Sequence, residues 1–165
     1  MTTEEIQNII IEHNLKPVEI HGELVYVNTN GDLWKQYNRI NIFKQVIVKP
    51  DNNGYLRPEI NKKNVRLHRI IGKVFLELDI DNPKEQIDHI NGVRTDNRVE
   101  NLRVVTNQQN QFNQPKAKGH YFYKYKNKYL AKIKVNNKDI HLGYFDLKED
   151  AQKAYLDAKK IYHII

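Results

Sequence analysis

The chain has 165 residues and a formal net charge of +7, with 39% hydrophobic residues, 28% charged residues and no cysteine. This length accommodates one ordinary domain or two to three small ones with modest cores. The lack of cysteine excludes disulfides and zinc–thiolate sites. No apolar run approaches the roughly 20 residues that span a bilayer, and the acidic N-terminus lacks the basic region of a secretory signal. We therefore expect a soluble, intracellular protein.

The positive charge is concentrated in one segment. Eight lysines and no acidic residue occur between positions 116 and 138, namely Lys116, Lys118, Lys124, Lys126, Lys128, Lys132, Lys134 and Lys138. Such a block suits a polyphosphate partner through counterion release, although a solvated surface or a disordered basic tail is the ordinary alternative. Aromatic residues alternate with these lysines, at Tyr121, Phe122, Tyr123, Tyr125 and Tyr129. They favour a folded, charged sheet over disorder.

The first third of the chain predicts a short helix followed by a small antiparallel β unit. The helix is expected over residues 3–14, where Ile6, Ile9 and Ile10 share one face and two glutamates occupy the first turn. Turn signals, notably Asn30-Gly31 and the Gly at 54, then separate short β-like runs. These runs cover residues 18–20, 23–28, 33–37, 43–48 and 55–60.

The middle of the chain predicts a supporting helix and a strand–loop–strand–helix unit. Apolar residues at helical spacing indicate a helix over 67–77, in which Gly72 permits close packing. Strands are expected over 86–90 and 101–105, and a short polar helix over 107–113.

The last part predicts three antiparallel strands over 121–125, 128–135 and 138–144, followed by a helix. In the middle strand, alternation places Ala131 and Ile133 on one face and Lys132 and Lys134 on the other. Asp146, with Glu149 three positions later, is expected to cap the final helix.

The most informative stretch joins three short motifs. They are Ile-Asp-His-Ile-Asn-Gly at 87–92, Asn-Arg-Val-Glu-Asn-Leu at 97–102 and Thr-Asn-Gln-Gln-Asn at 106–110, preceded by Leu-His-Arg at 67–69. Through these motifs, in this order and spacing, residues 65–113 resemble the HNH endonucleases, in particular the cysteine-free phage and intron homing type. The resemblance implies a ββα-metal core that hydrolyses DNA with a divalent ion.

The resemblance assigns roles to four positions: Asp88 and Asn110 as metal ligands, His89 as general base and Asn101 as the structural asparagine. Mg²⁺ or Mn²⁺ accepts carboxylate and carboxamide oxygens. His89 points to the strand face opposite Asp88, where its imidazole can act as a base. Asn110 stands where the family has its name-giving histidine, which favours an oxygen-preferring ion over zinc or nickel.

The roles of His68 and four arginines stay open. His68 and Arg69 either contact the scissile phosphate, or Arg69 pairs with an acidic residue such as Glu77 while His68 satisfies a buried backbone group. Arginine forks match phosphate oxygens, so the arginines near the motifs either clamp DNA or are ordinary surface charges. We count His68 with the catalytic candidates, and with the DNA-binding ones Arg69, Arg94, Arg98 and Arg103.

The C-terminal segment 119–163 resembles the plant ethylene-response-factor type of DNA-binding domain. The resemblance rests on Lys-Tyr-x-Ala-x-Ile at 128–133, Leu-Gly-Tyr-Phe-Asp at 142–146 and the helix pattern Ala-x-x-Ala-Tyr-x-x-Ala at 151–158. It implies a sheet laid into the major groove. Lysine is a point charge rather than a fork, so phosphate anchoring should outweigh base readout here. The candidate contacts are Tyr121, Tyr123, Lys124, Lys132, Lys134 and His141, although tyrosines on strands also serve as packing pairs.

Together these features predict an α+β protein in four parts. Residues 1–62 form the N-terminal helix and β unit, 63–113 the nuclease core, 114–118 a linker and 119–165 the DNA-binding domain. The expected function is a Mg²⁺- or Mn²⁺-dependent, site-specific endonuclease that cuts duplex DNA to 3′-hydroxyl and 5′-phosphate ends, one strand per site. We expect a monomer in the cytoplasm of a bacterial or phage-infected cell, with no membrane or small-molecule partner. The alternative is a non-catalytic DNA-binding protein on a degenerate nuclease scaffold.

Overall fold

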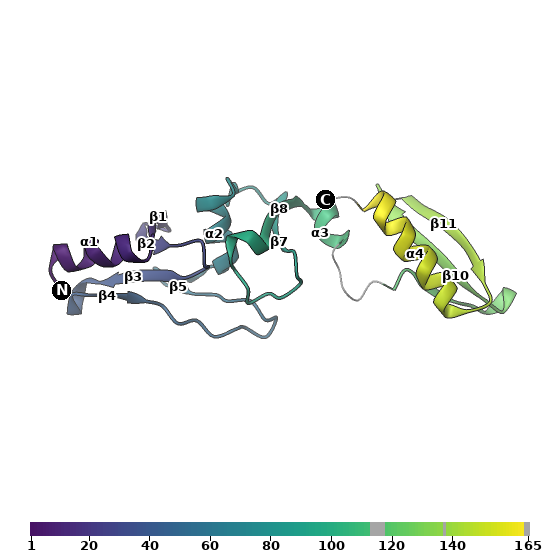
Figure 1. Cartoon of the computed structure of the whole chain (residues 1–165), viewed down its shortest axis with the longest axis horizontal. Helices are drawn as coiled ribbons and strands as arrows, with labels where there is room; N and C mark the ends of the chain where they lie inside the picture. Colours follow the sequence, from purple (N-terminus) through teal and green to yellow (C-terminus); the bar gives the residue numbers. More distant parts are fainter. Residues whose placement is uncertain (113–117, 137, 164–165) are drawn as a thin grey trace. The chain divides into compact units, whose positions relative to one another are not determined.

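The computed structural model describes residues 1–112, 118–136 and 138–163, and for residues 108, 111 and 112 the backbone alone. Short helices and small antiparallel sheets confirm the predicted α+β class. They divide into two compact units, Met1–Thr106 and Asn107–Ile165 (Figure 1). The predicted linker lies outside the described residues apart from Lys118. In the described part of the chain, no helix is long and apolar enough to cross a membrane.

The first unit starts with helix α1 (Thr3–Glu12) and a four-stranded antiparallel sheet. The helix begins in a capping box, in which Glu5 N donates to Thr2 Oγ1 (3.1 Å) and Thr2 N donates to Glu5 Oε2 (2.7 Å). The strands follow one another in space as they do in sequence: β1 (Lys16–Ile20), β2 (Glu23–Val27), β3 (Leu33–Tyr37) and β4 (Ile42–Gln45).

The strand predicted over 55–60 is much shorter than expected. Only Glu59–Ile60 (β5) pairs, with Lys63–Asn64 (β6). Pro58 has no N–H to donate to a ladder, and the backbone N–H of Tyr55 donates instead to Asp51 Oδ1 at 3.0 Å. Residues 51–58 therefore form a loop.

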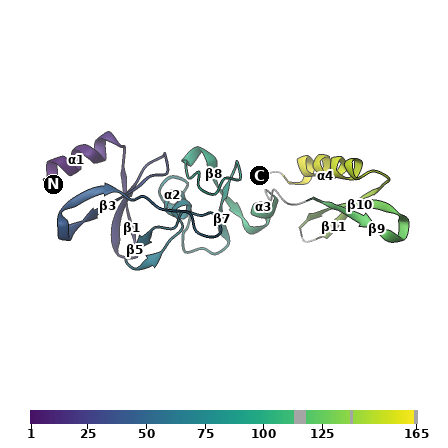
Figure 2. The ribbon, with the colours of Figure 1, turned by 90° about the horizontal axis from the view of Figure 1, so that it is seen from below.

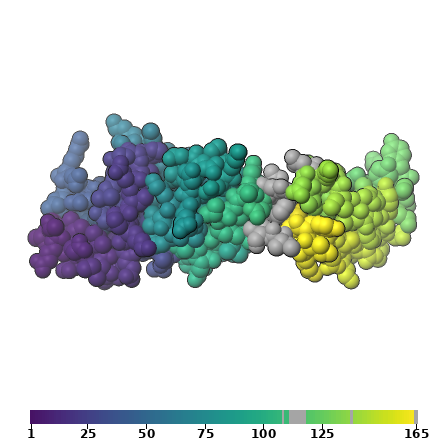
Figure 3. Space-filling view, turned by 90° about the horizontal axis from the view of Figure 1, so that it is seen from above, coloured from purple at the N-terminus to yellow at the C-terminus, as the bar shows by residue number. Residues whose placement is uncertain are grey.

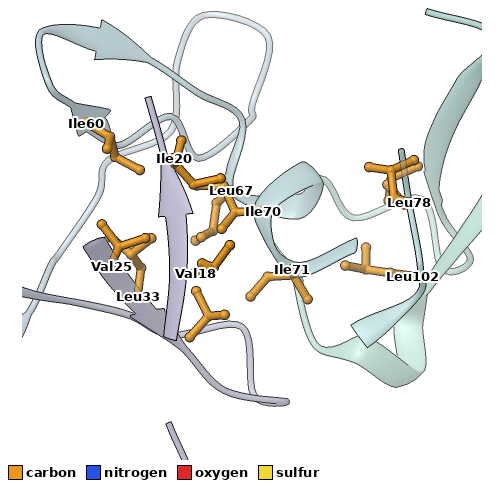
Figure 4. Close-up of a cluster of buried hydrophobic side chains, with 12 residues drawn as sticks. Val18, Ile20, Val25, Leu33, Ile60, Leu67, Ile70, Ile71, Leu78 and Leu102 are labelled. Atoms are coloured by element: carbon orange, nitrogen blue, oxygen red, sulfur yellow. The ribbon is translucent and has the colours of Figure 1, made fainter. Parts of the chain in front are cut away.

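Helix α2 (Leu67–Phe75) joins the N-terminal sheet to the predicted nuclease core. Leu67, Ile70 and Ile71 are almost fully buried and lie between the N-terminal strands and Leu102 (Figure 4). Burying each such side chain contributes about 1.5–3 kcal/mol. The boundary predicted at residue 62 thus falls inside a shared core, and residues 1–106 pack as one continuous body (Figure 3).

Two antiparallel strands follow α2, as the motif spacing predicts. They are β7 (Glu85–His89) and β8 (Leu102–Thr106), with a 3₁₀ turn, η2 (Val99–Asn101), just before β8. A Cβ on Gly72 of α2 would lie 2.7 Å from Ile87 Cδ1, so glycine allows the helix to approach β7 closely. Helix α3 (Asn107–Phe112) continues directly from β8 along the chain.

The second unit contains a three-stranded antiparallel sheet and one long helix. The strands are β9 (His120–Tyr123), β10 (Lys128–Val135) and β11 (Lys138–Phe145), with β10 in the centre and a 3₁₀ turn, η3 (Lys124–Lys126), after β9. Helix α4 (Lys148–Tyr162) covers one face of this sheet (Figure 2). The buried contact between them is made by Ile133, Tyr155 and Ala158.

The predicted cap of the last helix is wrong. The N-cap residue of α4 is Leu147, and no side chain makes a cap hydrogen bond there. The Asp146 carboxylate instead lies 3.1 Å from Lys128 Nζ, across the strand pair. The Asp146 carboxylate, which was expected to cap the helix, forms an ion pair with Lys128 instead.

Candidate active site

Asp88 and His89 end strand β7 and are both buried, with 5% of each residue exposed. Their partners on β8 are Arg103 and Leu102, respectively. Neighbouring residues of a strand point to opposite faces, so the carboxylate and the imidazole leave β7 on different sides. This is the arrangement expected from the motif.

Arg103 pairs with Asp88 across the two strands. Its Nε and Nη2 donate to the same carboxylate oxygen, Oδ2, at 2.9 and 2.7 Å. The Asp88 side chain is 7% exposed and that of Arg103 is 29% exposed, so the bond is largely shielded from water. The sequence predicted Arg103 as a DNA contact, whereas here its charge neutralises the expected metal ligand.

His89 is held by Asn97, a residue without a role among the sequence predictions. His89 Nε2 and Asn97 Oδ1 are 3.1 Å apart in a buried hydrogen bond. With the amide oxygen as acceptor, Nε2 carries the ring hydrogen in this pair. Asn97 thus holds the ring from its Nε2 side.

Asn101 organises the loop between β7 and β8. Its Nδ2 donates to the carbonyl oxygen of Asp96 at 2.8 Å, and its Oδ1 accepts from Asn91 N at 3.0 Å. These bonds close the loop that carries Asn97. Asn101 ties the loop backbone, as the sequence suggested, and supports His89 through Asn97.

His68 lies beside His89 in the interior. Their rings meet edge to face with centroids 5.0 Å apart. Burial, reinforced by the charges of His89 and Arg66, lowers the pKa of His68 from 6.5 to about 3. His68 Nδ1 is buried without a hydrogen-bond partner among the described residues. A neutral, buried His68 is therefore a packing partner of His89 in this structure, and its catalytic role stays a prediction.

Two of the predicted DNA-binding arginines, Arg69 and Arg98, form hydrogen bonds within the protein. Arg69 donates to the carbonyl oxygens of Ile80 (2.8 Å) and Glu85 (3.1 Å), which fixes the segment entering β7. Arg98 donates from Nε and Nη2 to Asp96 at 2.9 and 2.8 Å. Arg98 lowers the pKa of the Asp96 carboxyl mainly through this hydrogen bond. These bonds use part of each guanidinium, which has five N–H donors.

The turn between β2 and β3 of the N-terminal sheet packs against this loop. Val99 N donates to the carbonyl oxygen of Thr29 at 2.9 Å. Gly31 has φ +85°, and a Cβ there would lie 2.7 Å from the backbone of Asn97. The Asn30-Gly31 turn therefore packs directly against the residue that holds His89.

In the second unit, the register brings the predicted sheet contacts to one face. Lys132 pairs with His141, while Leu130, two residues earlier, pairs with Tyr121. Directly paired residues share a face, and this face is opposite the one that buries Ile133 against α4. One candidate is partly neutralised, because Lys132 Nζ lies 2.7 Å from Asp139 Oδ2. The remaining candidates on this face are Tyr123 and Lys134, and Lys124 lies in η3.

The expected metal ligands differ in how far the structure describes them. Asn110 is half-buried in α3, in the second unit, so its convergence with Asp88 stays a prediction. Among the described residues, no group of three or more His, Cys, Asp or Glu side chains is placed to hold a metal ion. The donors to be weighed are thus one carboxylate and one carboxamide, hard oxygen ligands that suit Mg²⁺ or Mn²⁺.

Comparison with known proteins agrees with this site. A family model described as HNH endonuclease matches residues 65–112, which include α2, β7, β8 and α3. The match is confined to this segment, which carries Asp88, His89, Asn101 and Asn110 and is less than half of the chain.

An HNH endonuclease of Acanthamoeba polyphaga mimivirus, named L247, is 32% identical over 96 residues. The match covers 58% of this chain and 24% of that protein, so the chain spans about a quarter of its length. The solved structure of the HNH homing endonuclease I-HmuI is 19% identical, with a TM-score of 0.48 and 76% of each chain covered.

Proposed function

We propose that the chain is a divalent-metal-dependent endonuclease that hydrolyses phosphodiester bonds of duplex DNA and leaves 3′-hydroxyl and 5′-phosphate ends. The observation that carries the proposal is the end of β7, where buried Asp88 and His89 leave the strand on opposite faces and Asn97 holds the imidazole. A carboxylate on one side and an oriented base on the other suit metal-assisted hydrolysis. With one such site per chain, a monomer would nick one strand.

Asp88 and Asn110 are the residues proposed to hold the ion. When bound, Mg²⁺ or Mn²⁺ supplies Lewis-acid stabilisation to the scissile phosphate and the leaving 3′ oxygen. Arg103 already neutralises Asp88, so we expect a bound cation to compete with this guanidinium. Once released, Arg103 is free to pair with a phosphate, which reconciles its observed partner with its predicted DNA contact.

His89 is proposed to take the proton of the attacking water at Nδ1. The Asn97 bond at Nε2 holds the ring in one tautomer, which is the condition for a directional base. The neutral His68 ring packs edge to face against the His89 ring, with centroids 5.0 Å apart. Asn101 keeps the loop closed and so keeps Asn97 in place.

The C-terminal sheet is proposed to position the enzyme on duplex DNA. Its face opposite α4 combines tyrosines with lysines, of which Lys134 is exposed. Phosphate contacts by such lysines fix position and register rather than read sequence. The proposal does not depend on base-specific contacts from this face.

The rival proposal is a non-catalytic DNA-binding protein, and one observation favours it. The Arg103–Asp88 pair places a permanent cation where the nuclease needs a metal. In a degenerate scaffold such a pair would simply stabilise the fold. The two proposals differ in whether any divalent ion can replace Arg103.

A plasmid assay separates the two proposals. Supercoiled plasmid with the full chain and Mg²⁺ should become nicked, EDTA should stop the reaction, and DNA ligase should reseal the nick because ligation needs a 3′-hydroxyl and a 5′-phosphate. Asp88→Asn and Asn110→Ala should remove nicking, whereas exposed Asn38→Ala should not. Binding of plasmid without cleavage under Mg²⁺ or Mn²⁺ would establish the rival.

A further inference from the structure

Tyr55 forms the centre of a cluster that joins Arg94, a predicted DNA contact, to Arg66. Its ring lies 5.2 Å from that of His68 and 6.2 Å from that of His89, measured between centroids. Two guanidinium groups stack on the same ring, with Arg66 Cζ at 4.7 Å and Arg94 Cζ at 4.9 Å from its centroid. Two arginines are thus gathered beside the proposed general base.

These two charges have no carboxylate partner. No Asp or Glu oxygen of the described chain lies within 4 Å of Arg66 or Arg94, whereas Arg57 and Arg103 each have one carboxylate partner and Arg98 has two. Arg94 Nη1 donates to the carbonyl oxygen of Asn53 at 2.7 Å, which orients the side chain without cancelling its charge. The cluster is therefore a pair of cations without an ion pair among the described residues, and the charge of Arg66 acts on Asp51 only at longer range.

Three separate segments hold the cluster in shape. Arg66 is the residue before α2, Arg94 lies in the loop after β7, and Tyr55 lies in the loop before β5. Leu67 N donates to the carbonyl oxygen of Leu56 at 2.9 Å, which fixes the first and third segments together. Stacking on a half-buried ring reduces the side-chain freedom that each arginine would lose on binding a ligand.

The positive charge of the cluster acts on His68. The charge of Arg66 contributes to the lowered pKa of His68, after the larger effect of burial. A stacked guanidinium keeps its N–H edge for hydrogen bonds, and two such edges match the oxygens of a phosphodiester. A cationic site of this kind beside a hydrolytic base fits an anionic substrate backbone.

We propose that Arg66 and Arg94, stacked on Tyr55, bind a backbone phosphate of the DNA strand that is cut and so place the neighbouring phosphodiester before His89. The inference rests on the proposed function for the identity of the ligand. It adds a phosphate-binding site built largely from the N-terminal part of the first unit.

DNA affinity measured in EDTA tests the site without cleavage. A fluorescent duplex is titrated with the full chain at several salt concentrations, for the parent, Arg66→Gln/Arg94→Gln, and the control Arg39→Gln, an exposed arginine with no aromatic or acidic partner among the described residues. Each lost phosphate contact should lower the steepness of log K against log salt by about 0.9. For the double variant alone, we expect the steepness of log K against log salt to decrease by about 1–2 and DNA binding to weaken at least about tenfold. The site is ruled out if both arginine changes give the same curves as the control.

A second measurement needs no substitution. In the parent labelled with ¹⁵N-arginine, titration with a short duplex should shift the side-chain Nε signals of Arg66 and Arg94 and leave that of Arg39 in place. Shifts confined to other arginines would overturn the proposal. Titration with inorganic phosphate in a parallel sample distinguishes a general anion site, which responds equally to both, from a DNA-backbone site, which responds at far lower duplex concentration.

The plasmid assay separates failure of this inference from failure of the proposed function. A parent that nicks DNA, with a double variant that binds and nicks like the Arg39 control, rejects the phosphate site and keeps the nuclease. A parent that never nicks, with a double variant that loses affinity, rejects the nuclease and keeps the phosphate site.

Discussion

Arg103 donates two hydrogen bonds to a single oxygen of Asp88, from the strand directly opposite. The carboxylate expected to bind a metal thus already has a cation at hydrogen-bond distance. In a buried site, removing one partner of such a pair leaves the other charge uncompensated. Stability and metal binding should therefore be linked through Arg103.

Arg103→Ala should destabilise the metal-free protein and increase its response to metal. We expect the free energy of unfolding in EDTA to fall by about 1–3 kcal/mol, less than for a fully buried pair because the Arg103 side chain is 29% exposed. Added Mg²⁺ should restore more stability to the variant than to the parent, since no guanidinium competes. Urea unfolding with and without Mg²⁺ measures both effects. Equal stabilisation of the two proteins by Mg²⁺ would argue against a metal at Asp88.

His68 should make stability fall in acid. Its pKa is lowered to about 3 in the folded protein against 6.5 when exposed, so between these pH values only the unfolded chain binds the proton. The contribution of neutral His68 to the free energy of unfolding is complete above pH 6.5. It is lost as the pH falls toward 3, at up to about 1.4 kcal/mol per pH unit.

His68→Phe should remove this dependence and keep an aromatic ring against Tyr55 and His89. The substitution should cost little at pH 7, because Nδ1 has no hydrogen-bond partner among the described residues. Unfolding free energies measured from pH 7.5 to 4 for both proteins test this. Parallel curves would mean that His68 is protonated in the folded state.

Asn97→Ala should slow cleavage without weakening DNA binding. The change removes the group that holds His89 Nε2, so the ring can rotate and change tautomer. Losing an orienting partner of this kind typically costs about 10- to 100-fold in activity. Nicking rates at saturating protein, with Asn38→Ala as the surface control, provide the measurement. An unchanged rate would remove Asn97 from the mechanism.

Lys132 and Lys134 should differ in their effect on DNA affinity. Lys132 is paired with Asp139 at 2.7 Å, so part of its charge is already neutralised. Lys134→Ala should therefore weaken binding more than Lys132→Ala, and Asp139→Asn should strengthen it by releasing Lys132. Duplex affinities in EDTA at fixed salt test the order. Unchanged affinity in all three variants would mean that DNA does not contact this sheet face, and the reverse order would mean that the Asp139 pair does not weaken the contribution of Lys132.

The elements were largely predictable because their signals are local. Alternation located β10 and β11 closely, and the isoleucine face with glutamates in the first turn located α1. The motif around Asp88 and His89 predicted a strand, a loop and a second strand in the correct order. These features depend on residues only a few positions apart.

The contacts that shape the site could not be predicted, because they join distant residues. The register of β7 on β8 decides that Arg103 faces Asp88 rather than solvent. Loop closure by Asn101 brings Asn97 to His89, eight positions away. The role of Tyr55 depends on three segments meeting around one ring, which no spacing in the sequence encodes.

The most direct test is the single-turnover rate of nicking by His89→Ala compared with the parent, at protein concentrations that saturate the DNA. Loss of a general base should lower the rate by about 10²- to 10⁴-fold, while DNA affinity in EDTA stays within about twofold. A His89→Ala protein that nicks DNA as fast as the parent would contradict hydrolysis at the end of β7.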